Sequence, residues 1–204
     1  TVLTLENAIK IILVKSANDV SVAIGEAIAG SEMEFVAMMN EEARALGMND
    51  TRFANPNGLP DGKQYTTARD LALLAVTTRR DFPAYAGFFA LEGINAGGEL
   101  IPNYNILLGR FAGADGMKTG YVCASGFNLA ASATRGGRTV VAIVLGALTQ
   151  RGGIKRIEPG VTRPKVVPVQ PPQTADSNSI SHAAAGLLSA HALAYSPARP
   201  PPAP

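Results

Sequence analysis

The segment from Gly113 to Tyr121 most constrains the fold, because two apolar runs typical of β-strands follow it at once. These runs extend from Phe127 to Ala133 and from Val140 to Leu145. Short apolar runs bounded by glycine and polar residues are typical of the strands of one sheet. We therefore expect the tripeptide Lys118-Thr119-Gly120, inside the first segment, to lie on a strand of that sheet.

This tripeptide has the side chains that a peptide-binding strand needs. Gly120 has no side chain to block a ligand backbone, Thr119 offers a short hydroxyl group, and Lys118 places an ammonium group beside the groove. Such a strand suits an anionic peptide end. A Lys-Thr-Gly tripeptide occurs by chance in roughly a few per cent of chains of this length, so the interpretation needs a second motif.

The second motif is Ser16-Ala17-Asn18, which falls between two predicted helices. Apolar spacing predicts a helix that begins after Thr4, its N-cap, and ends near Lys15, and another that ends at Gly30. In an extended turn, residues two apart project the same way, so the Ser16 hydroxyl and the Asn18 carboxamide would face one cleft. A hydroxyl can relay a proton, and a carboxamide can both donate and accept hydrogen bonds.

Caps, turns and apolar spacing predict the other elements up to residue 147. In chain order, these are a helix after the capping box Ser31 to Glu34, a surface crossing from Asn55 to Gly62, a helix capped by Thr67 to Asp70, a hairpin of Phe88 to Ile94 with Glu99 to Ile101, and a short helical turn from Asn103 to Leu108.

Composition favours one domain with an appendage. The chain has 204 residues, of which 47% are hydrophobic, enough for one ordinary core. We assign this domain to residues 1–150 and expect the proline-rich residues 151–204 to be a disordered or extended tail. No apolar run is long enough to cross a bilayer, and no charged leader with a cleavage site is present.

Several functions find no support in the residues. The formal charge is +2 and no basic run interleaves with aromatic residues, which argues against a nucleic-acid surface. The single Cys123 cannot form an internal disulfide, and with His182 and His191 it lacks metal-ligand spacing. We expect Cys123 to be a small packed residue.

A simpler interpretation of the serine motif competes with a site. Ser-x-Asn occurs by chance in roughly every second chain of this length, and serine or asparagine beside a helix start is usually a cap. The setting between two helices and the glycine-flanked lysine strand downstream favour a joint site. The residues alone leave both interpretations open.

Many collinear segments from about Thr1 to Ala147 resemble one family, the serine D-alanyl-D-alanine carboxypeptidases, which are low-molecular-mass penicillin-binding proteins that trim peptidoglycan stem peptides. The segments that carry the resemblance are Ser16-Ala17-Asn18-Asp19, Ala29-Gly30-Ser31, Phe35-Val36-Ala37-Met38-Met39-Asn40, Ala45-Leu46-Gly47-Met48, Thr51-Arg52-Phe53, Asn57-Gly58-Leu59, Tyr65-Thr66-Thr67-Ala68-Arg69-Asp70-Leu71-Ala72, Asn103-Tyr104-Asn105-Ile106-Leu107-Leu108, Asp115-Gly116-Met117-Lys118-Thr119-Gly120 and Gly126-Phe127-Asn128-Leu129-Ala130-Ala131-Ser132-Ala133.

The resemblance implies roles for five residues. Ser16 corresponds to the family's second catalytic serine in the proton path, and Asn18 to its substrate-orienting asparagine. Lys118 corresponds to the lysine that contacts the substrate carboxylate, while Thr119 and Gly120 line the docked peptide.

The resemblance also implies a fold, partners and a location. The expected fold is α/β (α+β), like that of penicillin-binding proteins and β-lactamases, with helices packed on an antiparallel sheet and incomplete at both ends. The expected substrate is a peptidoglycan stem peptide ending in D-Ala-D-Ala, with β-lactam antibiotics as inhibitors if the full site is present. The reaction needs no metal or organic cofactor, and the location would be the periplasm or cell envelope.

This sequence departs from the family pattern at three places. No serine has a lysine three residues on, whereas the family acylates the serine of a Ser-x-x-Lys motif that precedes the Ser-x-Asn turn, and here only residues 1–15 precede Ser16. After Ala147 the expected packed helix is replaced by a glycine- and proline-rich sequence. Tyr104 stands where related sequences often carry a basic residue, which predicts weaker carboxylate recognition.

Three hypotheses follow. The chain is the downstream part of a carboxypeptidase whose signal peptide and nucleophile motif lie upstream, or it is a non-catalytic remnant or paralogue that at most binds peptidoglycan peptides. A class A β-lactamase ranks behind both, because that class has Ser-Asp-Asn where this chain has Ser16-Ala17-Asn18.

Overall fold

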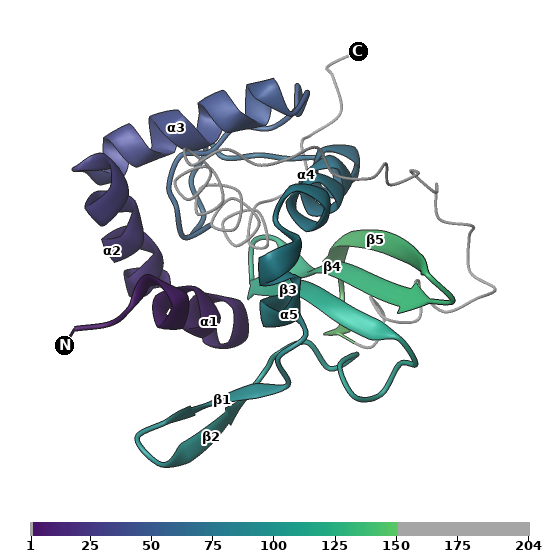
Figure 1. Cartoon of the computed structure of the whole chain (residues 1–204). Coiled ribbons are helices and arrows are strands. Elements are labelled where there is room, and N and C mark those ends of the chain that lie inside the picture. The colour runs from purple at the N-terminus through teal and green to yellow at the C-terminus, as the bar shows by residue number, and fades with distance from the viewer. Residues whose placement is uncertain (1, 151–204) are drawn as a thin grey trace.

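A computed structural model of the chain describes residues 2–150, which form helices packed on an antiparallel sheet (Figure 1). The α+β class predicted from the sequence is confirmed. The predicted tail, residues 151–204, lies outside the described residues. The elements in chain order are α1 (Leu5–Lys15), α2 (Asn18–Ala29), α3 (Glu32–Ala45), α4 (Ala68–Asp81), the 3-10 turn η1 (Pro83–Tyr85), α5 (Ala86–Phe89), β1 (Gly93–Ala96), β2 (Glu99–Pro102), β3 (Ala114–Val122), β4 (Gly126–Arg135) and β5 (Arg138–Ala147).

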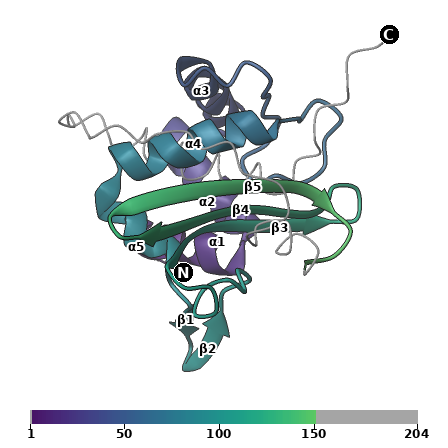
Figure 2. The same cartoon turned by 90° about the vertical axis from the view of Figure 1, so that its right-hand side faces the viewer.

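The main sheet contains β3, β4 and β5 in that order, so β3 is an edge strand of the part that the structure describes. Helix α4 lies along one face of this sheet (Figure 2), and α5 packs against β3. The hairpin of β1 and β2 projects from the body of the molecule (Figure 1). The three strands predicted around Lys118 are therefore confirmed, and the lysine strand has an edge at which a peptide could pair.

The helix caps predicted from the sequence are confirmed. The Thr4 hydroxyl accepts a hydrogen bond from the Asn7 amide at 3.2 Å, and Ser31 and Thr67 cap α3 and α4 in the same way. Each cap satisfies an amide that the helix itself leaves without a partner. The start of each of these helices is therefore fixed locally by the sequence.

Apolar side chains form one buried cluster on each face of the sheet. The larger cluster joins the helices to one face and includes Ile12, Phe35, Met39 and Leu74, each at most 2% exposed. The smaller cluster lies on the opposite face, where Leu107 and other residues pack against Leu129, Ala131, Val144 and Ala147. Because side chains alternate along a strand, each strand contributes to both clusters.

Two element predictions were wrong in part. The first hairpin strand begins at Gly93 and not at Phe88, because Phe89 is buried at 1% exposure in the helix α5 that packs on β3. The segment from Asn103 to Leu108 forms turns and no helix. The Asn103 side-chain oxygen accepts a hydrogen bond from the Asn105 amide at 2.8 Å, and the Asn105 side-chain oxygen accepts one from the Leu107 amide. These side-chain hydrogen bonds compete with the backbone hydrogen bonds of a helix.

Cys123 was also predicted wrongly, because it is exposed and lies in the turn between β3 and β4. Among the described residues, no helix has both the length and the apolar character that a membrane crossing requires.

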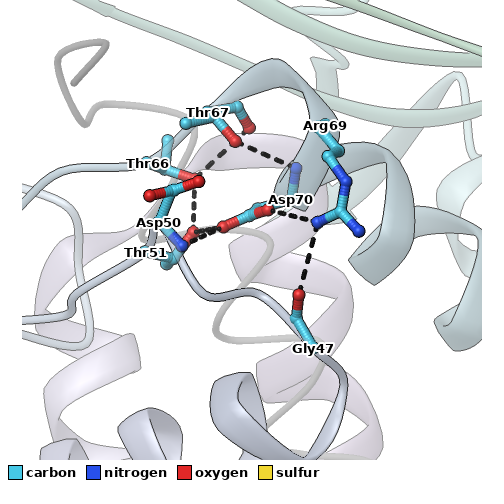
Figure 3. A network of polar contacts seen from close by, with 7 residues as sticks. All are labelled: Gly47, Asp50, Thr51, Thr66, Thr67, Arg69 and Asp70. Atoms are coloured by element: carbon cyan, nitrogen blue, oxygen red, sulfur yellow. Dashed lines mark hydrogen bonds and ion pairs between the residues drawn. The ribbon is translucent and has the colours of Figure 1, made fainter. Parts of the chain in front are cut away.

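Asp70 is completely buried and holds the start of α4 to the loop that follows α3 (Figure 3). Its carboxylate accepts hydrogen bonds from the Asp50 amide and the Thr51 hydroxyl, each at 2.9 Å, and pairs with Arg69 at 3.2 Å. The same Arg69 reaches the Gly47 carbonyl at the end of α3. This network has a donor for each carboxylate oxygen, so it fixes the two helices relative to each other.

Candidate active site

Ser16 and Lys118 meet although 102 residues separate them in the chain. The Lys118 ammonium donates to the Ser16 hydroxyl at 2.5 Å and to the Thr119 carbonyl at 2.6 Å. Ser16 lies between α1 and α2, and Lys118 lies on β3. The two motifs singled out in the sequence therefore face each other across a contact between a helix end and the sheet edge.

Lys118 is only 2% exposed. This burial removes water from the ammonium group and lowers the pKa of Lys118 to about 7. Near neutral pH a large fraction of the amine is therefore uncharged and can take up a proton from a neighbour. A lysine in this state is suited to proton transfer, and perturbed pKa values of this kind gather at functional sites.

The backbone at Ser16 explains how its hydroxyl reaches β3. Ser16 ends α1 in the left-handed conformation, with φ at 61°, and its amide donates to the Ile12 carbonyl at 2.9 Å. Of the non-glycine residues that the structure describes, Ser16 alone has a positive φ. Such a conformation is unusual for serine, and residues that adopt it gather at functional sites.

Asn18 does not sit in an extended turn as predicted. Ala17 is the extended N-cap of α2, and Asn18 is the first residue of that helix. The short turn leaves room for only one extended residue, so the alternation expected between Ser16 and Asn18 does not apply. The Asn18 Oδ1 atom is buried and accepts no hydrogen bond from the described part of the chain. A buried carboxamide oxygen of this kind is suited to accept an N–H group from a ligand.

A cavity of about 350 Å³ opens beside the next two residues of the lysine strand. It is lined by Thr119 and Gly120, together with Tyr104, Asn105, Ile106, Tyr121, Phe127, Asn128, Leu129 and Gln150. The rings of Tyr121 and Phe127 stack with centroids 4.2 Å apart and form an apolar part of its wall. Ser16, Asn18 and Lys118 are not among the residues that line this cavity.

The strand alternation accounts for this division. Lys118 pairs with Ala130, which packs on the helix side, whereas Thr119 pairs with Leu129 in the cluster on the other face. Lys118 and Thr119 therefore project to opposite faces of β3. A peptide along the edge of β3 would meet the Ser16–Lys118 pair on one side and the Thr119 cavity on the other.

The sequence analysis missed the residue before Ser16. The Lys15 ammonium donates to the Tyr104 hydroxyl at 2.9 Å and so reaches a residue that lines the cavity. The position of Lys15 next to Ser16 could have indicated a role at the site, but a lysine at the end of a helix is explained equally well by the helix itself. Within residues 2–150, the structure contains no cluster of three or more residues that could hold a metal ion.

Solved structures of penicillin-binding proteins share this architecture. Penicillin-binding protein 5 from Haemophilus influenzae aligns with a TM-score of 0.73 at 33% identity, covering 77% of this chain and 47% of that one. Penicillin-binding protein D2 from Listeria monocytogenes, in its cefotaxime-bound form, aligns with a TM-score of 0.70 at 30% identity, covering 76% and 64%. The fold is therefore that of the low-molecular-mass penicillin-binding proteins.

The family follows from the sequence match. Residues 1–149 match the model of peptidase family S11, D-alanyl-D-alanine carboxypeptidase, and the chain belongs to this family. The D-alanyl-D-alanine carboxypeptidase DacC of Escherichia coli is 37% identical over 141 residues, which are 69% of this chain and 35% of that protein. The chain thus spans about a third of the length of this curated relative.

Proposed function

We propose that this chain binds the D-Ala-D-Ala end of peptidoglycan stem peptides and carries the proton-transfer half of a serine carboxypeptidase site. The observation that supports this most directly is the contact of 2.5 Å between the Lys118 ammonium and the Ser16 hydroxyl. Family membership supports this substrate class, and we place the chain in the periplasm or cell envelope by the same likeness. β-Lactam antibiotics would occupy the same groove.

Each residue has a distinct part in this proposal. The peptide backbone pairs with the edge of β3 at Thr119 and Gly120, and the Asn18 carboxamide oxygen accepts a peptide N–H group. The protonated fraction of Lys118 donates a proton to the Ser16 oxygen while the Ser16 hydroxyl gives its own proton to the departing D-alanine amine. This transfer leaves Lys118 uncharged, as its pKa of about 7 allows. The scaffold holds both groups in place before the substrate arrives.

The acylated nucleophile is a separate requirement. Acyl transfer in this family needs a serine activated by a lysine three residues on, and the 204 residues contain no such pair. Binding and proton transfer alone break no peptide bond. The chain by itself is therefore expected to bind the peptide without cleaving it.

The test measures binding and chemistry separately on the 204-residue chain. Nuclear magnetic resonance titration with diacetyl-L-Lys-D-Ala-D-Ala should shift amides of β3 and of the α1–α2 turn, while the L-Ala-L-Ala peptide should not. Lys118→Met and Ser16→Ala should weaken the binding of the D-peptide at least about fivefold. Neither release of D-alanine nor covalent labelling by fluorescent penicillin is expected.

Two results would contradict the proposal. Equal affinity for the D- and L-peptides would remove the assigned substrate class. Shifts confined to residues outside β3 and the α1–α2 turn would place the binding elsewhere. Separately, covalent labelling by penicillin would contradict the expectation that these 204 residues bind without cleaving, because labelling requires a nucleophile among them.

A further inference from the structure

The wall of the cavity beside Thr119 is formed largely by aromatic rings. Tyr121 stacks on Phe127 with ring centroids 4.2 Å apart, and Tyr104 contributes a third ring. Tyr104 and Tyr121 are 47% and 49% exposed, so their rings present apolar surface to the solvent. Grooves lined by aromatic rings are the surfaces on which proline-rich segments dock in peptide-recognition domains. The wall therefore suits a proline-rich ligand.

The cavity also has donors for the carbonyl groups of such a ligand. A polyproline II segment makes no internal hydrogen bonds, so its carbonyl groups need partners outside the segment. The Tyr104 hydroxyl accepts from the Lys15 ammonium at 2.9 Å and keeps its own proton to donate. The Gln150 side-chain nitrogen donates one N–H group to the Tyr104 carbonyl at 3.2 Å and has a second N–H group. The cavity thus combines apolar contact with hydrogen-bond donors.

The described part of the chain ends at this cavity. Gln150 is its last residue and lines the cavity. After a linker of 13 residues comes the segment 164–172, in which four of nine residues are proline and none is glycine. Three residues complete one turn of polyproline II, so the rings of Pro168 and Pro171 would lie on one face. A ligand of suitable chemistry is therefore tethered to the rim of the cavity.

The tether means that docking needs only weak affinity. A flexible linker of 13 residues has an r.m.s. end-to-end distance of about 20 Å and gives an effective concentration of about 1 mM. An intrinsic Kd of about 1 mM would then keep half of the molecules docked. A second proline-rich stretch, residues 197–204, follows a linker of 46 residues, so its effective concentration should be about sevenfold lower. The nearer segment is the favoured occupant.

We infer that this cavity is a docking site for residues 164–172 of the same chain, which place their proline rings against the stacked pair of Tyr121 and Phe127. The inference goes beyond the proposed function and does not depend on it. The cavity lies on the face of β3 opposite Lys118, and none of its lining residues takes part in the proton transfer.

The test records amide shifts in the nuclear magnetic resonance spectrum of the 204-residue chain. A double variant, Pro168→Ala with Pro171→Ala, should change the shifts of the cavity-lining residues of β3 and β4, because the docked rings are lost. The matched control, Pro197→Ala with Pro200→Ala, removes two prolines of the same spacing and should leave these shifts unchanged.

Tyr121→Ala tests the contact from the side of the cavity. Tyr121 is about half exposed, and its removal should release the segment. The amide signals of the three valines in residues 164–172 should then move to their positions in the double proline variant. Tyr85→Ala should leave these signals in place, because Tyr85 packs edge-to-face on Phe88, at a centroid distance of 5.6 Å, and does not line the cavity.

A synthetic peptide of residues 163–173 should restore the contact in the double proline variant. Its addition should return the cavity shifts toward their wild-type values with a Kd of about 1 mM or below. The same peptide with alanine at both proline positions should bind at least about threefold more weakly.

Four results would overturn the inference. Unchanged cavity shifts in the double variant would mean that the segment does not dock. A change in the control variant instead would assign the cavity to residues 197–204. Movement of the signals of residues 183–194 in Tyr121→Ala would assign it to that weakly apolar segment. Cavity shifts that depend on protein concentration would assign it to a second copy of the chain. None of these measurements uses a peptidoglycan peptide, so they stay informative if the proposed function fails.

Discussion

Asp70 and Lys118 are both charged side chains with almost no exposure, at 0% and 2%, but their surroundings differ. The Asp70 carboxylate accepts from the Asp50 amide and the Thr51 hydroxyl and also pairs with Arg69 (Figure 3). Lys118 donates to a hydroxyl and to a carbonyl, and burial lowers its pKa to about 7. The surroundings of Asp70 provide hydrogen-bond donors and a cation for its charge, whereas the surroundings of Lys118 make a charged ammonium group unfavourable.

This difference separates a structural network from a candidate site. A buried carboxylate with donors on both oxygens ties chain segments together. A buried amine that is easily deprotonated contributes less to stability and can exchange a proton at neutral pH. Substitutions at the two positions should therefore change stability in opposite directions.

The largest loss of stability is expected at Asp70. Asp70→Ala removes the buried carboxylate that accepts from the half-buried Asp50 amide and Thr51 hydroxyl, and it should lower the free energy of unfolding by about 3 kcal/mol. Asp70→Asn should lose less, because one amide oxygen can accept both hydrogen bonds. Urea unfolding followed by circular dichroism measures these differences.

Arg69→Met is the matched control for the ion pair. The Arg69 side chain is 68% exposed, so its removal should cost less than about 1 kcal/mol. Losses of equal size at Arg69 and Asp70 would mean that the ion pair and not the hydrogen-bond network stabilises this junction.

Lys118→Met should instead raise the free energy of unfolding at neutral pH, by about 2 kcal/mol. The pKa of lysine in the unfolded chain is about 10.4, so between that value and about 7 the unfolded state binds more protons than the folded state. Wild-type stability therefore rises with pH through this window, and the advantage of Lys118→Met should fall by about 2 kcal/mol between pH 7 and pH 9.

The measurement is the difference in unfolding free energy between the variant and the wild type across this pH range. Lys10→Met, which removes an exposed-surface ion pair with Glu6, should show no comparable pH dependence. A constant difference between Lys118→Met and the wild type from pH 6 to pH 9 would mean that Lys118 keeps its charge in the folded chain.

Local signals predicted much of the fold. The N-caps Thr4, Ser31 and Thr67, and the strands that follow Gly113, depend on neighbours in the sequence and were confirmed. The hairpin start was wrong because the burial of Phe89 against β3 depends on packing between distant segments. Periodicity cannot report which apolar residue will find such a partner.

In the candidate site, too, the sequence predicted some features correctly and missed others. The motifs around Ser16 and Lys118 predicted that these residues would meet, and their contact bears this out. The position of Asn18 was wrong because α2 begins one residue after its N-cap Ala17, and helix ends are poorly defined by spacing alone. The contact of Lys15 with Tyr104 joins residues 89 positions apart, and no local pattern encodes it.

The smallest stability effect is expected at Asn18, the polar group of the candidate site whose oxygen has no donor among the described residues. Asn18→Ala removes this buried oxygen and places a better helix former in the first turn of α2. The free energy of unfolding should change by less than about 1 kcal/mol, toward higher stability. Binding of the D-Ala-D-Ala peptide should weaken at the same time.

Asn105 is the matched asparagine. It is 3% exposed, donates to the Gly116 carbonyl at 3.0 Å and accepts from the Leu107 amide at 3.2 Å, so Asn105→Ala should destabilise the chain by about 2 kcal/mol. A similar loss for Asn18→Ala would show that Asn18 stabilises the fold like Asn105. If Asn18→Ala instead leaves stability intact and weakens peptide binding, the Asn18 oxygen serves the ligand and not the fold. The contrast between Asp70 and Lys118 would then hold for neutral buried side chains as well.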